Sequence, residues 1–333
     1  MRIVITGGSG NVGTALLRRL HGGGHELVAV SRRRPPDTDP YRGVEWIEAD
    51  LATEDALPAL TRACDGADAV VHTAWLIQPS HDRELMRRTN QHGTRAVAQA
   101  AVAAQVSHLV HLSSIGAYSP GPTSTPVTED WATNGVPTSA YSVDKAAAER
   151  ILDEFEPALT ITRLRPSLIL QADAAGEVAR YFLGPLVPTR LLRRPVLRFA
   201  PWPRTLSVQF VHADDVAAAI DTLLARRVRG AFNVAAEPPI DRAVFADLFG
   251  GVGPPAAPKL LRVVAALTWR LRLQPTEPGW LDLAMTLPLL DTTRLRELGW
   301  SPEHPGTEVL TGFVAALAHG EGGRGPLLYP ERA

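Results

Sequence analysis

The chain has 333 residues, 45% of them hydrophobic, which is enough to bury a large core in one domain or in two closely packed ones. Its 34 Lys and Arg residues balance 35 Asp and Glu residues, and the formal net charge of -1 gives no electrostatic reason to expect a nucleic acid as partner. A single cysteine, Cys64, excludes an intrachain disulfide and a metal site built from several cysteines.

Short apolar runs alternate with helical patterns over the first two-thirds of the chain. This alternation is typical of a parallel sheet with helices on both faces, and it predicts a doubly wound α/β fold of the Rossmann type. Strands are expected at residues 2–6, 26–31, 44–49, 69–74, 108–114 and 159–164, with shorter ones at 208–212 and 231–234. Helices are expected at residues 14–20, 85–104 and 141–155.

The first strand begins at residue 2, and no charged and apolar regions of a signal peptide precede it. No apolar run reaches the roughly 18 residues that a membrane span requires. We therefore expect a cytoplasmic enzyme without a membrane span.

The composition of the chain changes after residue 170. Prolines between residues 183 and 204 prevent long regular elements. We expect a smaller substrate-binding lobe over the carboxyl edge of the sheet, where ligands bind in open α/β sheets. The basic, strongly apolar segment 259–273 is interpreted as a lid over the substrate, and contact with a membrane surface is the alternative. The predicted division assigns residues 1–170 and 205–236 to the dinucleotide-binding domain, and residues 171–204 and 237–333 to the lobe.

A glycine-rich turn joins the first strand to the first helix. It reads RIVITGGSGNVG, in which Gly7, Gly10 and Gly13 serve the tight turn, the close approach of backbone to a pyrophosphate, and the packing of helix on strand. The free N–H groups at the helix start, around Asn11 and Val12, would bind the pyrophosphate. Because a strand precedes the turn and a helix follows it, the context is the one that a dinucleotide-binding site requires.

The second strand ends in a basic turn at Ser31 and Arg32. An acid at this point would bind the adenosine ribose and favour NAD, whereas an arginine accommodates the 2′-phosphate of NADP. The sequence here is SRRR, and the first acid after it is Asp37. NADP(H) is therefore the preferred cofactor, with NAD(H) as the alternative, although a basic turn that meets only solvent would have the same sequence.

Tyr141 and Lys145 stand four residues apart in the sequence YSVDK, a spacing that places both side chains on one face of a helix. The chain has five tyrosines and only two lysines, so a chance pair is rare, and a lysine in so arginine-rich a chain indicates a chemical need. A tyrosine close to an ammonium group can give a proton to a substrate oxygen or take one from it. We expect this pair to be catalytic.

Together with Thr6, the glycine spacing resembles the loop of the extended short-chain dehydrogenase/reductase family, the family of NAD-dependent epimerases and dehydratases. The resemblance extends through YSVDK, TRLRPSL and FVHADDVA to a C-terminal LGWSP, and so covers nearly the whole chain. It implies that Ser114, rather than Ser113, binds the substrate oxygen, and that Lys145 bonds the cofactor ribose. It also implies a homodimer formed through helices 85–104 and 141–155. Further cofactor contacts implied by the family are Asp50, Leu51, Thr73, Ala74, Asn90 and Pro166.

Three departures from the family pattern concern the substrate. Leu168 replaces an asparagine that contacts the diphosphate in nucleotide-sugar enzymes, and Ile115-Gly116 replaces the Asp-Glu pair of sugar dehydratases. The lobe is also rich in apolar side chains, which suit an apolar ligand or the packing of the lobe itself. These are Trp75, Leu183, Leu186, Leu191, Leu192, Phe199 and Trp202. The predicted substrate contacts are Trp75, Ser114 and Leu168. Arginines of this stretch could instead bind phosphates, namely Arg180, Arg190, Arg193, Arg194, Arg198 and Arg204.

The sequence thus favours an NADP(H)-dependent oxidoreductase that reduces a ketone or aldehyde, or oxidises a secondary alcohol, of a mainly apolar small molecule. A sugar or nucleotide-sugar epimerase is the alternative. A cofactor-binding regulator without turnover is disfavoured, because it would not need the intact catalytic set. His212, Asp214 and Asp215 stand too close along the chain to form a good metal cage, so structural roles are expected for them and no metal is expected.

Overall fold

A sheet of seven parallel strands forms the centre of this computed structural model, which describes residues 1–77, 81–183 and 188–320. The strand order is β10-β7-β5-β4-β1-β2-β3, and every neighbouring pair runs parallel. The order changes direction between β1 and β4, and in such sheets the ligand crevice opens at the carboxyl ends of the strands beside this point. The strands are β1 (Arg2–Thr6), β2 (Glu26–Ser31), β3 (Glu45–Glu48), β4 (Ala69–His72), β5 (His108–Leu112), β7 (Thr160–Pro166) and β10 (Gly230–Val234).

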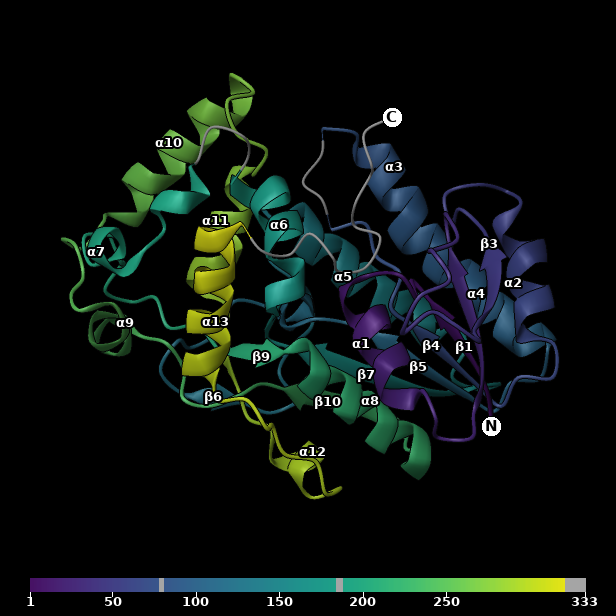
Figure 1. Cartoon of the computed structure of the whole chain (residues 1–333). Helices are drawn as coiled ribbons and strands as arrows, with labels where there is room; N and C mark the ends of the chain where they lie inside the picture. The colour runs from purple at the N-terminus through teal and green to yellow at the C-terminus, as the bar shows by residue number, and fades with distance from the viewer. Residues whose placement is uncertain (78–80, 184–187, 321–333) are drawn as a thin grey trace.

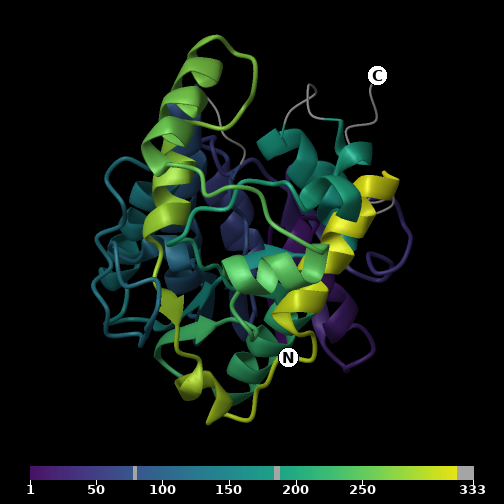
Figure 2. The same cartoon turned by 90° about the vertical axis from the view of Figure 1, so that its left-hand side faces the viewer.

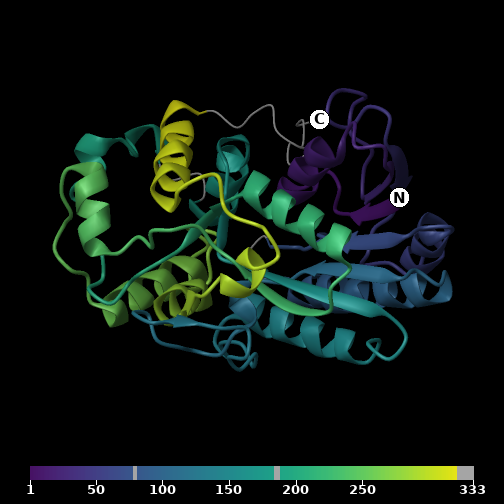
Figure 3. The ribbon, with the colours of Figure 1, turned by 90° about the horizontal axis from the view of Figure 1, so that it is seen from below.

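Helices cover both faces of the sheet, which confirms the predicted Rossmann-type fold (Figure 1 and Figure 3). Because both faces are covered, the middle of β1 is apolar on both sides rather than alternating, with Ile3, Val4 and Ile5 all buried. One face packs against α1 (Asn11–Leu20) and α8 (Ala213–Arg226). The other face packs against α2 (Ala56–Cys64), α4 (Gly93–Ala103) and α5 (Ala140–Asp153).

Most predicted elements differ from the structure by one or two residues at their ends, and three differ more. The first helix begins at Asn11 rather than at residue 14, because extended Gly10 directly precedes the first helical turn. The expected helix 85–104 is divided into α3 (Arg83–Arg87), a π-helical turn η1 (Arg88–His92) and α4. The expected strand 208–212 shortens to β9 (Phe210–His212), which pairs with β8 (Leu168–Leu170) outside the main sheet.

The remaining elements gather at the end of the molecule away from β3 (Figure 1 and Figure 2). The proline-rich stretch contains only short elements, as expected, and a third apolar core joins parts of it to segments far along the chain, including α13. Leu186 and residues 321–333, which the sequence assigned to the lobe, lie outside the described residues. The elements are η2 (Ile115–Ala117), β6 (Pro126–Val127), η3 (Ala172–Ala174), α6 (Ala175–Val178), η4 (Ala179–Leu183), η5 (Thr189–Leu191), α7 (Arg194–Leu197), α9 (Arg242–Phe249), α10 (Pro258–Arg270), α11 (Pro278–Thr286), β11 (Leu289–Leu290), α12 (Thr293–Arg296) and α13 (Gly306–His319).

None of the helices in the described part of the chain combines the length and the apolar composition that crossing a bilayer would need.

Candidate active site

The turn after β1 leaves no room for side chains at two of its glycines. Gly7 has φ +74°, and a Cβ there would lie 2.7 Å from the Cα of Ala74. A Cβ on Gly13 would lie 2.2 Å from the carbonyl oxygen of Gly7, which in turn accepts a hydrogen bond of 2.9 Å from the N–H of Gly10. The helix α1 therefore starts close against the carboxyl ends of β1 and β4, with no acidic side chain in its first turn. This open, positive helix end fits the pyrophosphate of a dinucleotide.

A residue from far along the chain reaches the same turn. The side-chain amide of Gln171 donates to the carbonyl oxygen of Asn11 at 3.2 Å and also to its side-chain oxygen. Sequence reasoning did not predict this contact, because nothing local indicates a contact across 160 positions. Val12, next to Asn11, is buried in the core on the α1 side of the sheet.

The turn after β2 presents its basic side chains to solvent. The hydroxyl of Ser31 donates to the carbonyl oxygen of Arg33 at 2.7 Å, which bends the chain directly after the strand. Arg32, Arg33 and Arg34 are exposed, so their guanidinium groups are free to meet an anion at the edge of the sheet.

The other predicted cofactor contacts lie at strand ends or on the helices that follow. Thr73 donates to the carbonyl oxygen of Thr6 at 2.7 Å, which ties the end of β4 to the end of β1. Asn90, on the π-helical turn, accepts from the N–H of Leu76 at 2.7 Å and donates to its carbonyl oxygen at 3.2 Å. Asn90 thus holds the segment after Ala74 in place. The remaining three are Asp50, exposed after β3, Leu51, buried against Gly93, and Pro166, buried at the end of β7.

Ser114 and Tyr141, predicted as catalytic, are in direct contact. The Ser114 hydroxyl hydrogen-bonds Tyr141 and accepts from the N–H of Gly116 at 2.9 Å. Ser113 instead donates to Glu149 on α5, so the geometry favours Ser114 as the substrate-facing serine. A Cβ on Gly116 would lie 2.8 Å from the Tyr141 ring, so the ring itself occupies the space that a dehydratase acid at this position would need.

The amine of Lys145 lies beneath an aromatic ring. Its Nζ is 3.5 Å from the centroid of Trp75 and donates to the carbonyl oxygen of Leu112 at 2.8 Å, while the centroid of Tyr141 is 6.0 Å away. Burial lowers the pKa of Lys145 to about 7, against the opposing effect of the Glu149 and Asp144 carboxylates.

Burial also dominates the acidity of Tyr141. It raises the pKa of the phenol to about 12, and the hydrogen bond from Ser114 acts weakly in the opposite direction. Desolvation of the charged form is therefore the main influence on the acidity of this phenol. Tyr141 is a protonated phenol at neutral pH, a state suited to giving a proton to a substrate oxygen.

Aromatic side chains surround the phenol. The ring of Trp280 on α11 lies 4.7 Å from Tyr141, Trp75 lies 6.2 Å away, and Phe182 packs against Trp280 at 4.8 Å. The indole nitrogen of Trp75 is buried and has no hydrogen-bond partner within the described residues, so a polar ligand atom can bind it. Sequence reasoning missed Trp280 and Phe182, because no local spacing connects them to the catalytic helix. Leu168 begins β8 on a separate sheet and is 38% exposed.

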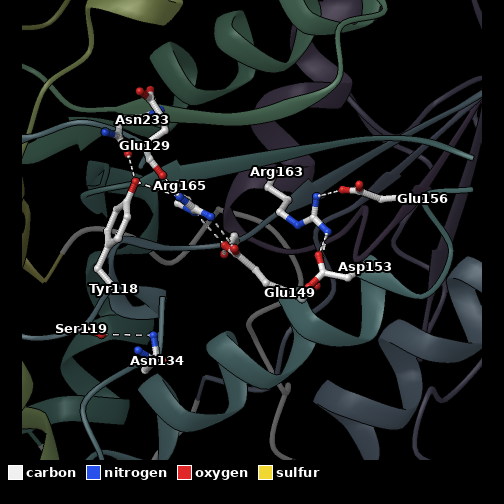
Figure 4. Close-up of polar contacts among 11 residues, drawn as sticks. Tyr118, Ser119, Glu129, Asn134, Glu149, Asp153, Glu156, Arg163, Arg165 and Asn233 are labelled. Atoms are coloured by element: carbon white, nitrogen blue, oxygen red, sulfur yellow. Dashed lines mark hydrogen bonds and ion pairs between the residues drawn. The ribbon is translucent and has the colours of Figure 1, made fainter. Parts of the chain in front are cut away.

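A buried ion pair supports the catalytic helix from behind (Figure 4). Arg165 of β7 donates to both carboxylate oxygens of Glu149, at 2.9 and 2.6 Å, and to the hydroxyl of Tyr118 at 3.0 Å. The hydroxyl of Tyr118 in turn donates to the side-chain oxygen of Asn233 in β10 at 2.7 Å. Glu149 stands one helical turn after Lys145, so this network fixes the helix that carries both catalytic side chains and places a carboxylate near the amine.

His212, Asp214 and Asp215 make contacts within the fold at the start of α8. The Nδ1 of His212 accepts from the N–H of Asp214 at 3.2 Å and caps α8. The buried carboxylate of Asp215 accepts from the N–H groups of Glu303 and His304, at 2.8 and 3.2 Å. The side chain of Asp214 accepts from Arg18 of α1 at 3.0 Å, so each of the three side chains has a structural partner.

Comparison with known proteins places these features in a family. The model of the family described as "NAD dependent epimerase/dehydratase family" matches residues 3–235. The chain is 32% identical over 240 residues to 2'-dehydrokanamycin reductase of Streptomyces kanamyceticus, which is 69% of this chain and 60% of that protein. It is 28% identical over 324 residues to an uncharacterized protein of Mycobacterium tuberculosis, covering 95% of this chain but 30% of the longer relative. The chain therefore spans less than two-thirds of the length of these curated relatives.

Among solved structures, the Thermus thermophilus UDP-glucose 4-epimerase in complex with NAD has a TM-score of 0.69 and 21% identity. The match covers 95% of this chain and 99% of the epimerase chain. At this level of identity the likeness shows a common fold.

Proposed function

This chain belongs to the NAD dependent epimerase/dehydratase family, and we propose that it is an NADP(H)-dependent oxidoreductase acting on a mainly apolar small molecule. It reduces a ketone or aldehyde, or oxidises a secondary alcohol. The observation that carries the proposal is the position of the Tyr141 phenol, beside Ser114 and bordered by the aromatic rings of Trp75 and Trp280. The match to a protein named as a reductase supports it.

Each residue of the site has a separate role in the proposed reduction. When bound, NADPH would supply a hydride for the carbonyl carbon. Ser114 and Tyr141 hydrogen-bond the carbonyl oxygen, and Tyr141 gives it a proton as negative charge develops there. Lys145, in its ammonium form, stabilises the phenolate that is left. The aromatic rings exclude water from the reacting atoms and present an apolar wall to the rest of the substrate.

The residues predicted to hold the dinucleotide are the glycine turn with Asn11 and Val12, the basic turn at Ser31 and Arg32, and the strand-end residues described above. The preference for NADP(H) rests on the exposed guanidinium groups after β2 and on the lack of a strand-end acid. NAD(H) is the alternative cofactor.

Three further parts of the proposal concern the whole molecule. Residues 171–204 and 237–333 form the substrate lobe. A homodimer forms through α4 and α5, which lie side by side and are joined by the bond of Arg95 to Glu154 at 2.6 and 2.7 Å. The enzyme works in the cytoplasm, where the nicotinamide cofactors are held. Light scattering that returned a mass near 35.9 kDa would contradict the dimer.

The decisive experiment is a screen of carbonyl compounds with purified full chain, in which consumption of NADPH is followed by absorbance. We expect turnover with ketones or aldehydes that carry apolar substituents, and none with the Tyr141→Phe variant. Turnover that survives this substitution would reject the proposed chemistry.

An epimerase of sugars or nucleotide sugars is the second candidate, because the family named by the matching model includes such enzymes. Such an epimerase retains its cofactor through the reaction and consumes no NADPH. Incubation with UDP-, TDP- and GDP-sugars followed by separation of epimers distinguishes the two, since an epimerase would produce the second epimer without net change in cofactor absorbance.

A further inference from the structure

The helix α10 turns an apolar face toward solvent. Leu260, Val263, Val264, Leu267 and Leu271 are between 52% and 63% exposed. Their spacing along the helix places them on one side, in what we call the apolar stripe. Isolated apolar residues on a surface are ordinary, but a contiguous apolar patch marks a place where something binds.

The opposite side of α10 is already packed. Trp269 stacks on His81 with ring centroids 3.7 Å apart and planes 4° from parallel. Arg262 donates to the carboxylate of Asp282 on α11 at 2.8 Å. These contacts hold α10 against α11, the helix that carries Trp280, and against the segment at His81. The apolar stripe is therefore not needed for the packing of α10.

The segment that carries the apolar stripe has charged residues of one sign only. The sequence contains no Asp or Glu from residue 248 to residue 276, although the whole chain has 35 of them. Lys259, Arg270 and Arg272 are exposed on or directly after α10. The combination of an apolar stripe with basic residues at its borders is typical of helices that lie in the interface of a membrane.

A second stretch of the sequence lacks acidic residues. Residues 178–213 also contain no Asp or Glu. Within them Leu191, Val196 and Phe199 are exposed, beside exposed Arg190 and Arg198. This segment includes α7, which with α10 occupies the end of the molecule away from β3 and α2 (Figure 1 and Figure 2).

We propose that this end of the protein docks on a membrane surface containing anionic lipids. The apolar stripe enters the boundary between headgroups and acyl chains, and the basic residues contact lipid phosphates. A second copy of the chain is a poorer occupant, because it would bring two acid-free basic surfaces together. A nucleic acid would use the charge but not the apolar stripe. An acidic protein is the remaining competitor, and the test separates it.

The test is flotation of the full chain with vesicles of phosphatidylcholine alone and of equal parts phosphatidylcholine and phosphatidylglycerol. We expect binding to the anionic vesicles, weakened by added salt. The double variant Val263→Glu/Leu267→Glu should lower the partition coefficient by at least roughly tenfold, because two side chains no longer enter the apolar boundary. Leu57→Glu, at an exposed position on α2, is the matched control and should bind as the unaltered chain does.

Because the substituted side chains are exposed, circular dichroism and the melting temperature should not change. Should the double variant nevertheless misfold, Lys259→Glu/Arg270→Glu tests the charge separately and should also reduce binding. Failure of the folded chain to bind anionic vesicles at low salt overturns the proposal and leaves an acidic protein as the occupant to seek. The proposal is also overturned if the Leu57→Glu control loses as much vesicle binding as the double variant. It is overturned as well if the double variant abolishes self-association while vesicle binding persists.

Discussion

The amine of Lys145 lies 3.5 Å from the centre of the Trp75 ring, within a site where burial lowers its pKa to about 7. Lys145 is therefore charged below about pH 7 and neutral above it. Tyr141, with a pKa of about 12, stays protonated across the same range. If the ammonium form is the active one, kcat/KM for reduction falls as the pH rises through about 7, and this change belongs to Lys145 rather than to Tyr141.

Substitution of Asp144 should move this limb of the pH profile. The Asp144 carboxylate raises the pKa of Lys145, so Asp144→Asn lowers that pKa and shifts the fall in kcat/KM to lower pH. The amide can still pair with Gln91, which now donates to Asp144 at 2.7 Å. The measurement is kcat/KM as a function of pH, with Asp55→Asn, at the exposed start of α2, as control. A limb that stays in place would mean that Lys145 does not control it.

Removal of the Tyr141 hydroxyl should abolish proton transfer while the ring packing remains. We expect Tyr141→Phe to lower kcat by about 100-fold or more, the usual scale for loss of a general acid, with NADPH binding retained. Lys145→Arg should also be poorly active, because a guanidinium does not replace a compact amine. Tyr41→Phe, which removes a hydroxyl bonded to Thr14 at 3.0 Å, is the matched control for loss of a buried phenol. Near-normal turnover in Tyr141→Phe is incompatible with the mechanism.

Arg32 should decide the choice of cofactor. The exposed guanidinium groups after β2 favour a 2′-phosphate, so NADPH should bind more tightly than NADH, and Arg32→Asp should shift the preference toward NADH. Fluorescence titration of both cofactors measures the two dissociation constants. The same change at Arg62, an exposed residue on α2, should leave their ratio unaltered. Equal or tighter binding of NADH by the unaltered chain would refute the assignment.

Removal of one partner from the ion pair of Glu149 and Arg165 should lower the stability of the protein more than replacement of both partners by apolar residues. Glu149→Gln leaves a buried guanidinium without its carboxylate and should lower the free energy of unfolding by about 3–5 kcal/mol. The double variant Glu149→Leu/Arg165→Met removes both charges and should recover part of that loss. Denaturant unfolding measures both. A single variant as stable as the unaltered chain would show that the pair carries little stability.

Nucleotide sugars should not bind the active site. Burial of a diphosphate requires donors and cations in return, and Leu168 removes an expected donor. UDP-, TDP- and GDP-sugars at millimolar concentration should neither raise the melting temperature nor inhibit carbonyl reduction. Trp280→Ala should raise KM for apolar substrates, whereas Trp131→Ala, an exposed tryptophan, should not. Clear stabilisation by one nucleotide sugar, together with its epimerisation, would favour the second candidate function.

Features that depend on neighbouring residues could be predicted from the sequence by itself. The bounds of β1 and β2 agree with the apolar runs, because a strand covered on both faces needs a continuous apolar sequence. The glycine turn was identifiable because backbone geometry allows only glycine at Gly7. The Tyr141 and Lys145 pair was visible because residues four apart on a helix share a face.

The tertiary structure decided what depends on segments far apart in the chain. It placed Trp280 and Phe182 beside Tyr141, Gln171 beside Asn11, and the carboxylate of Glu149 beside Ser113, which distinguishes the two serines. It also decided the acidity of the phenol and of the amine, because a pKa depends on how much water the fold excludes. Spacing along the chain carries information about helix faces and strand edges, but desolvation and long-range contact exist only once the chain has folded.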